Sequence, residues 1–281
     1  MTRFLLALAF AAHLNAADWL TANNHVQNDE RELSAETVPN LKLLWKVSFG
    51  EQLTAPVVLG PIFTHRGIKE LAFVAGAADN LYAVDADLGR LVWKRHFETA
   101  PACGATLTAA PVLAPYYGPA PEGDDASTPR RSLFVLSSDG QLHTVRPADS
   151  HDLALPIPFL PAGSKAQDLD LKGSVVSTYV ENGCAHPKVG QWSIQLNVPG
   201  AKPSVQEAAQ KPPMPVVAAN GLMFRTSGTA LTVSDLKTGK QLYASSAIGS
   251  EPVVNQLAIA NGHIYVVVGQ TVYCYGFPME I

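Results

Sequence analysis

The chain has 281 residues, which is long enough for one large β domain or two ordinary domains. Its apolar fraction of 47% and charged fraction of 16% exclude an intrinsically disordered protein. The net charge is −4 and Lys and Arg form no cluster, so a nucleic-acid partner or an anionic membrane surface has no electrostatic support. Gly and Pro, 21 of each, are scattered singly, a pattern typical of many short strands joined by tight turns.

The first residues resemble an export signal. Arg3 supplies the positive start, Phe4–Ala12 is a short apolar run, and Ala16 offers a small residue for cleavage. The alternative is an apolar N-terminus with no targeting role. The run is too short to span a bilayer, and no other stretch approaches such a span. We therefore predict a signal peptide at 1–16, an N-terminal segment at 17–40, one domain at 41–281, and a periplasmic or secreted protein.

A unit of three alternating strands recurs along the chain. Its clearest copy comprises Leu71–Gly76, Asn80–Asp85 and Gly89–Lys94. Weaker copies follow at Leu133–Val145, Val175–Gln195, Leu222–Tyr243 and His263–Gly276.

Each unit follows another short apolar strand, and a four-stranded unit of roughly 40–50 residues is the size of a propeller blade. We count five units, so the prediction is an all-β propeller of about five four-stranded antiparallel blades. The fifth unit lacks an outer strand of its own. Residues 42–49 align with residues 90–97, with Trp45 at the position of Trp93. We predict that this N-terminal strand completes the last blade and closes the ring, which would remove an exposed sheet edge.

The turn before the third strand of a unit carries a recurring motif, which in its first copy is Ala83, Asp85, Gly89 and Trp93. The Asp85 carboxylate can accept backbone N–H bonds in the turn, and Gly89 can adopt a left-handed conformation without a Cβ clash. The small Ala83 leaves room for close packing, and Trp93 offers a large apolar face between blades. The second copy contains Asp235, Gly239 and Tyr243.

This motif resembles the tryptophan-docking motif of quinoprotein (PQQ-repeat) dehydrogenase-like propellers. Residues 18–20 and 33–45 also look like the start of such a propeller. The resemblance implies the fold over most of residues 18–277, and it makes PQQ with Ca²⁺ a possible cofactor. Related dehydrogenases run to about twice this length, and the adjacent Cys-Cys pair that lies over their cofactor is absent here.

Candidate ligands are few, and each has a structural explanation. Catalytic and metal-binding motifs such as HExxH, GxSxG and CxxC are absent, so we assign no catalytic residue and no metal site. Cys103 and Cys184 lie in Gly-containing loops and could form a disulfide, whereas Cys274 lies in a strand and is expected to be a buried thiol. Other side chains that lie near turns or strands are Asp79, Asp124, Asp125, Asp139, Asp168, Trp19, Trp192, His65, His96, His143 and His263.

Two functions stay open at this point. The first is a non-catalytic exported propeller that binds a protein or a small ligand through its loops or its central funnel. The alternative is a PQQ-dependent dehydrogenase of alcohols or sugars, or a shortened relative of one, which rests on family resemblance alone. A decayed gene product with an incomplete ring would instead expose sheet edges and dimerise or aggregate.

Overall fold

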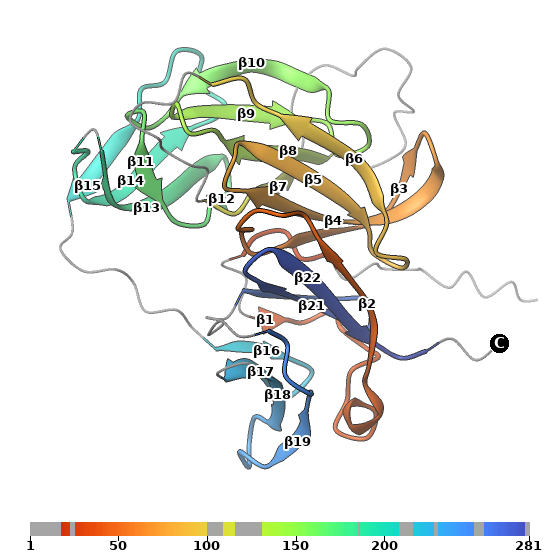
Figure 1. The fold of residues 1–281 in the computed structure, drawn as a ribbon. Coiled ribbons are helices and arrows are strands. Elements are labelled where there is room, and N and C mark those ends of the chain that lie inside the picture. The colour runs from red at the N-terminus through yellow and green to blue at the C-terminus, as the bar shows by residue number, and fades with distance from the viewer. Residues whose placement is uncertain are drawn as a thin grey trace, which may run out of the picture.

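A computed structural model describes residues 18–22, 26–99, 109–115, 131–184, 186–207, 216–227, 230–249 and 256–278. The predicted signal peptide lies outside these residues. Within them the fold is all-β, and the only helix is the short 3₁₀ helix η1 (Val38–Asn40). The strands form five sheets that are arranged as the blades of a propeller (Figure 1). The predicted five-bladed architecture is confirmed.

The first two blades each contain four antiparallel strands. Blade 1 consists of β3 (Val57–Thr64), β4 (Gly67–Gly76), β5 (Asn80–Asp85) and β6 (Leu91–His96). Blade 2 consists of β7 (Val112–Pro115), β8 (Arg131–Leu136), β9 (Gln141–Val145) and β10 (Asp152–Pro158).

The last three blades depart in detail from a simple four-stranded plan. Blade 3 consists of β11 (Ser164–Ala166), β12 (Asp170–Lys172), β13 (Val175–Gly183), β14 (Gly190–Gln195) and β15 (Ser204–Glu207). Both β11 and β12 pair with the same strand, β13. Blade 4 consists of β16 (Val217–Ala219), β17 (Leu222–Ser227), β18 (Ala230–Asp235) and β19 (Gln241–Ala244), with β1 (Val26–Gln27) added in parallel to β16. Blade 5 consists of β20 (Leu257–Ala260), β21 (His263–Val268), β22 (Thr271–Gly276) and β2 (Lys42–Ser48).

The N-terminal strand β2 completes blade 5, as the sequence predicts. It pairs antiparallel with β22, and Trp45 lies opposite Cys274. A register shift between Leu43 and Trp45 marks a bulge in β2. Blade 5 therefore joins a strand from the start of the chain to three strands from its end (Figure 1).

The strands on the inner side of the ring are β3, β7, β12, β16 and β20. Strand β3 contacts β7 of blade 2 and β20 of blade 5, and β7 contacts β12 of blade 3. The middle strands β4 and β5 of blade 1 are packed on both faces over most of their length, as are β8 of blade 2 and β21 of blade 5. All six residues of β5 are buried, for example. These strands therefore lose the alternation of buried and exposed residues, whereas β18 of blade 4 keeps buried residues at alternate positions.

The buried apolar side chains in the described part of the chain gather into two large clusters. One cluster spans blades 1, 2 and 3. The other spans blades 4 and 5 and includes Val58, Ala72 and Ala86 of blade 1. Blade 1 therefore belongs to both clusters, and its junctions with blades 2 and 5 are central to the stability of the whole ring.

The cysteines have different states. Cys274 is a buried free thiol, and burial raises its pKa well above the usual value. Cys184 is disulfide-bonded. Cys103, its predicted partner, lies outside the described residues, so the pairing of these two cysteines stays a prediction.

Candidate functional site

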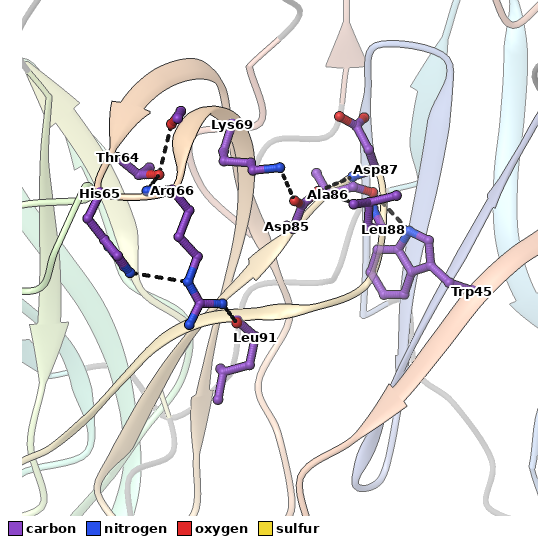
Figure 2. Close-up of polar contacts among 11 residues, drawn as sticks. Trp45, Thr64, His65, Arg66, Lys69, Asp85, Ala86, Asp87, Leu88 and Leu91 are labelled. Carbon is purple, nitrogen blue, oxygen red and sulfur yellow. Dashed lines mark hydrogen bonds and ion pairs between the residues drawn. The ribbon is translucent and has the colours of Figure 1, made fainter.

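The turn between β5 and β6 is held by the Asp85 side chain. One carboxylate oxygen accepts the backbone N–H groups of Asp87 and Leu88, each over 3.1 Å, and the other lies 2.7 Å from the Lys69 ammonium (Figure 2). The N–H of Gly89 donates to the Asp85 carbonyl oxygen over 2.8 Å. Gly89 has a φ of +65°, which a residue with a Cβ rarely adopts.

The turn between β18 and β19 repeats this geometry. The Asp235 carboxylate accepts the backbone N–H groups of Lys237 (3.1 Å) and Thr238 (2.6 Å), and the Thr238 hydroxyl lowers the pKa of Asp235 below its usual value. Gly239 has a φ of +71°, and its N–H donates to the Asp235 carbonyl oxygen over 2.9 Å. Both motif copies therefore hold turns, and their carboxylates are engaged by the chain itself.

Aromatic side chains of the outer strands contact the following blade. The Trp45 indole N–H in blade 5 donates to the Ala86 carbonyl oxygen in blade 1 over 2.9 Å (Figure 2). The Trp93 indole N–H in blade 1 donates to the Pro147 carbonyl oxygen, in the turn after β9 of blade 2, also over 2.9 Å. Within blade 1, Ala83 is fully buried and lies opposite Trp93 in the β5–β6 pairing.

Tyr243 of blade 4 occupies the position equivalent to these tryptophans. Its ring lies edge-on to Tyr275 of blade 5, with 6.5 Å between the ring centroids. The aromatic contacts thus link blade 4 to blade 5, blade 5 to blade 1, and blade 1 to blade 2.

An unexpected feature lies at the centre of the ring, where residues 18–22 and 26–27, here called the axial segment, run past the inner strand of each blade in turn. Its contacts are single β-bridges from Trp19 to Val58 of β3 and from Thr21 to Val112 of β7, a hydrogen bond from the Thr21 hydroxyl to the Leu169 carbonyl oxygen just before β12 (2.9 Å), and the pairing of β1 with β16. The Gln27 side-chain amide completes the series with a hydrogen bond to the Ile259 carbonyl oxygen of β20 over 3.4 Å.

Two side chains anchor the start of the axial segment. Trp19 is fully buried, and its indole nitrogen has no hydrogen-bond partner among the described residues. The Asp18 carboxylate accepts the backbone N–H of Gly60 over 2.7 Å and lies 3.5 Å from the Arg131 guanidinium. Burial nevertheless raises the pKa of Asp18 above its usual value. The segment is thus fixed by contacts that leave some of its polar groups poorly compensated.

The residues that follow the axial segment are held by one carboxylate. Glu30 is almost fully buried, and one of its oxygens accepts the N–H groups of Arg31, Glu32 and Leu33 over 2.7–3.1 Å. Its other oxygen accepts the N–H of Gly262, in the β20–β21 turn, over 3.1 Å. This carboxylate therefore ties the N-terminal residues to blade 5.

A second carboxyl group lies where blades 1 and 5 meet. Glu70 of β4 accepts a hydrogen bond from the Asn261 side-chain amide over 2.8 Å, while its other oxygen is buried without a partner among the described residues. Burial is the main cause that raises the pKa of Glu70 to about 8, and the nearby carboxylates of Asp87, Asp18 and Glu32 add to it. Glu70 could not be singled out from the sequence, because the carboxylates that raise its pKa come from separate parts of the chain.

Three aspartates that the sequence analysis named as candidate ligands accept hydrogen bonds from other residues of the protein. Asp79 is buried, and its carboxylate accepts hydrogen bonds from the Thr99 hydroxyl and from the N–H and hydroxyl of Ser138 in blade 2. Asp139 accepts the Ser137 hydroxyl, and Asp168 accepts the Ala110 N–H over 3.4 Å. Asp124 and Asp125 lie outside the described residues.

The candidate histidines are dispersed over separate environments. His65 is exposed and accepts a hydrogen bond from Arg66 over 3.2 Å (Figure 2), and His96 contacts the Asn80 side chain over 3.1 Å. His143 contacts the Ser137 hydroxyl over 2.9 Å, and burial lowers the pKa of His143. His263 packs near Tyr265 in blade 5.

A PQQ site with Ca²⁺ would need an available aromatic face beside several converging oxygen ligands. Trp19 is fully buried, while the indoles of Trp45, Trp93 and Trp192 donate to backbone carbonyl oxygens. Among the residues that the structure describes, no three or more His, Cys, Asp or Glu side chains are grouped so that they could hold a metal ion. The described residues therefore contain no set of converging carboxylate ligands for this Ca²⁺.

Blade 1 presents an apolar pair to solvent. The β3–β4 hairpin extends beyond β5 and projects from the blade (Figure 1), and near its tip Phe63 pairs with Ile68. These two side chains are 72% and 60% exposed. No helix in the described part of the chain is long and apolar enough to cross a bilayer.

The chain resembles several solved structures, and it spans only about half the length of two of them. A europium-containing methanol dehydrogenase matches at 13% identity and a TM-score of 0.45, covering 89% of this chain and 56% of that one. The quinohemoprotein alcohol dehydrogenase from Comamonas testosteroni matches at 12% identity and a TM-score of 0.43, covering 89% and 46%. BamB from Moraxella catarrhalis matches at 10% identity and a TM-score of 0.25, covering 84% of this chain and all of that one.

Sequence comparison assigns the family more directly. None of the curated proteins matches the sequence. The family model described as outer membrane protein assembly factor BamB matches residues 30–275, which is most of the chain and includes strands of all five blades. The chain therefore belongs to this family of PQQ-repeat β-propellers.

Proposed function

We propose that this chain is an exported, non-catalytic propeller that binds another protein. The observation that carries the proposal is the axial segment, whose residues 18–22 and 26–27 contact the inner strands of blades 1, 2, 4 and 5 and the Leu169 carbonyl oxygen of blade 3. Inner strands arranged around an extended polypeptide suit the recognition of protein better than that of a flat cofactor. The alternative is a propeller that binds a small ligand through its loops.

Two further observations support a protein partner. The family description names an assembly factor for outer membrane proteins, and such a factor acts on other proteins. The exposed pair Phe63 and Ile68 on the projecting hairpin provides apolar surface of the kind found at protein interfaces. The apolar run Phe4–Ala12 supports export, and we place the protein in the periplasm or outside the cell.

The experiment that tests a non-catalytic role is a thermal-shift titration of the purified protein with PQQ, with and without Ca²⁺. We expect no rise in melting temperature with PQQ concentration. A ligand that binds only the native state stabilises it by RT ln(1 + L/Kd), where L is the free ligand concentration, so bound PQQ would raise the melting temperature further with each increase in its concentration. Such a rise, dependent on Ca²⁺, would instead make a PQQ-dependent dehydrogenase the leading function. Folded protein is verified in the same samples by its cooperative melting transition.

A further inference from the structure

The inner strands of the blades are edge strands of their sheets. Strands β3 and β7 each end the strand order of their blade, so one side of each has no sheet partner. The axial segment uses this side: the Trp19 N–H donates to the Val58 carbonyl oxygen over 2.9 Å, and the Val58 N–H donates back over 2.8 Å. The Leu113 N–H likewise donates to the Leu20 carbonyl oxygen over 2.8 Å. This is the main-chain pattern by which sheets accept an added extended peptide.

Side chains supply the selectivity of this contact. Trp19 is fully buried in the cluster that joins blades 4, 5 and 1. The carboxylate before it is recognised by the Gly60 N–H and by Arg131. Arg131 begins β8 of blade 2, so two blades contribute to the carboxylate site. The occupant that this chemistry fits is an extended segment in which a carboxylate precedes an aromatic residue.

The segment fills this place imperfectly. The buried indole nitrogen of Trp19 has no partner among the described residues. A buried polar group without a hydrogen bond carries an uncompensated desolvation cost. Burial also disfavours the charged form of Asp18 despite its two partners. These costs weaken the contact of the segment with the ring relative to a fully satisfied one.

We infer that the ring axis is a binding site for an extended peptide of a partner protein, that the axial segment is its intramolecular occupant, and that the partner enters by displacing this segment. The inference rests on the proposed protein-binding function and names its site. The segment acts as a tethered competitor, whose effective concentration is high because it is part of the same chain. Binding of a free peptide to the unmodified protein is therefore weak.

The first test uses hydrogen exchange on the full-length wild-type protein. Displacement requires the axial segment to open without unfolding of the ring, and such local openings expose their amides sooner than global unfolding does. We expect the amides of Trp19 and Leu113 to exchange at least about tenfold faster than those of Phe73 and Ala75 in β4. Equal rates at these four amides would show that the segment is a permanent part of the core and would overturn the inference.

The second test measures binding directly. The probe is a synthetic peptide with the sequence of residues 17–29 and a fluorophore at its C-terminus, titrated with protein and followed by anisotropy. We expect Trp19→Ala to bind the probe at least about tenfold more tightly than wild type, because the competitor is weakened. Trp192→Ala serves as the control protein, and the probe with Trp19→Ala serves as the control peptide; both should bind as weakly as the wild-type pair.

Equal affinity of the two peptides for a folded Trp19→Ala protein would also overturn the inference. If that variant does not fold, Trp19→Phe replaces it, and the hydrogen-exchange result on wild type still decides. Failure of the proposed function would appear as Ca²⁺-dependent stabilisation of the unmodified protein by PQQ, in an experiment without the peptide. Failure of the displacement inference would appear in the hydrogen-exchange and peptide-binding tests. The two failures are therefore distinguishable.

Discussion

The indole nitrogen of Trp45 donates to the carbonyl oxygen of Ala86 over 2.9 Å, and this hydrogen bond joins blade 5 to blade 1 (Figure 2). Trp45 comes from a strand near the start of the chain, whereas the other three strands of blade 5 come from its end. The junction therefore depends on both ends of the sequence. It also depends on Gly89, because a Cβ built there would lie 2.6 Å from the Trp45 ring.

The two motif glycines offer a matched test of this junction. Gly89→Ala should destabilise the protein more than Gly239→Ala, since both have positive φ but nothing lies within 4 Å of a Cβ at Gly239. We expect a loss of about 1 kcal/mol at Gly239 from backbone strain alone. At Gly89 we expect about 2–4 kcal/mol, because displacement of the Trp45 ring is added. Urea unfolding followed by fluorescence measures both, and equal losses would contradict a special role for the indole contact.

A second prediction concerns the junction of blades 1 and 2. Asp79 is buried, has a φ of +56°, and accepts three hydrogen bonds from Thr99 and Ser138. Asp79→Ala should lower the free energy of unfolding by about 2–4 kcal/mol, because buried donors lose their acceptor in a backbone conformation that Ala adopts poorly.

Asp79→Asn should cost only about 1 kcal/mol, because Asn tolerates positive φ and retains one acceptor oxygen. Asp29→Ala, at an exposed position, is the control. Chemical denaturation gives the three values. If Asp79→Ala were no worse than Asp29→Ala, the hydrogen bonds of Asp79 would contribute nothing to holding blades 1 and 2 together.

The sequence was sufficient for the blades because their signals are local and repeated. Strand alternation and the turn motif recur in register, so the match of Trp45 to Trp93 was enough to predict that β2 completes blade 5. The axial segment has no such signal. Its bridge from Trp19 to Val58 involves one residue on each side. The axial segment also does not belong to the repeated unit, so no second copy could reveal its position. Glu70 was missed for a related reason, since its environment is assembled from the N-terminal residues, blade 1 and blade 5.

The last prediction concerns pH. Burial raises the pKa of Glu70 to about 8 from a usual value of 4.5, so the folded state favours the protonated carboxyl. The folded state binds more protons than the unfolded state between these two values, and stability therefore falls as pH rises from about 4.5 to about 8. Asp18, Glu32 and Asp87 add negative charge nearby, and the Asn261 amide donates to Glu70.

Glu70→Gln should remove this loss, because the amide stays neutral and its oxygen can still accept from Asn261. We expect the variant to be more stable than wild type at pH 8 by about 1–3 kcal/mol, a value reduced from the full shift because Glu70 is partly accessible to solvent. At pH 5 the two proteins should melt at nearly the same temperature. Glu98→Gln, at an exposed position, is the control and should follow wild type at both values. A Glu70→Gln protein whose melting temperature declines with pH as steeply as that of wild type would show that Glu70 is charged in the folded state, and that the junction of blades 1 and 5 accommodates its charge.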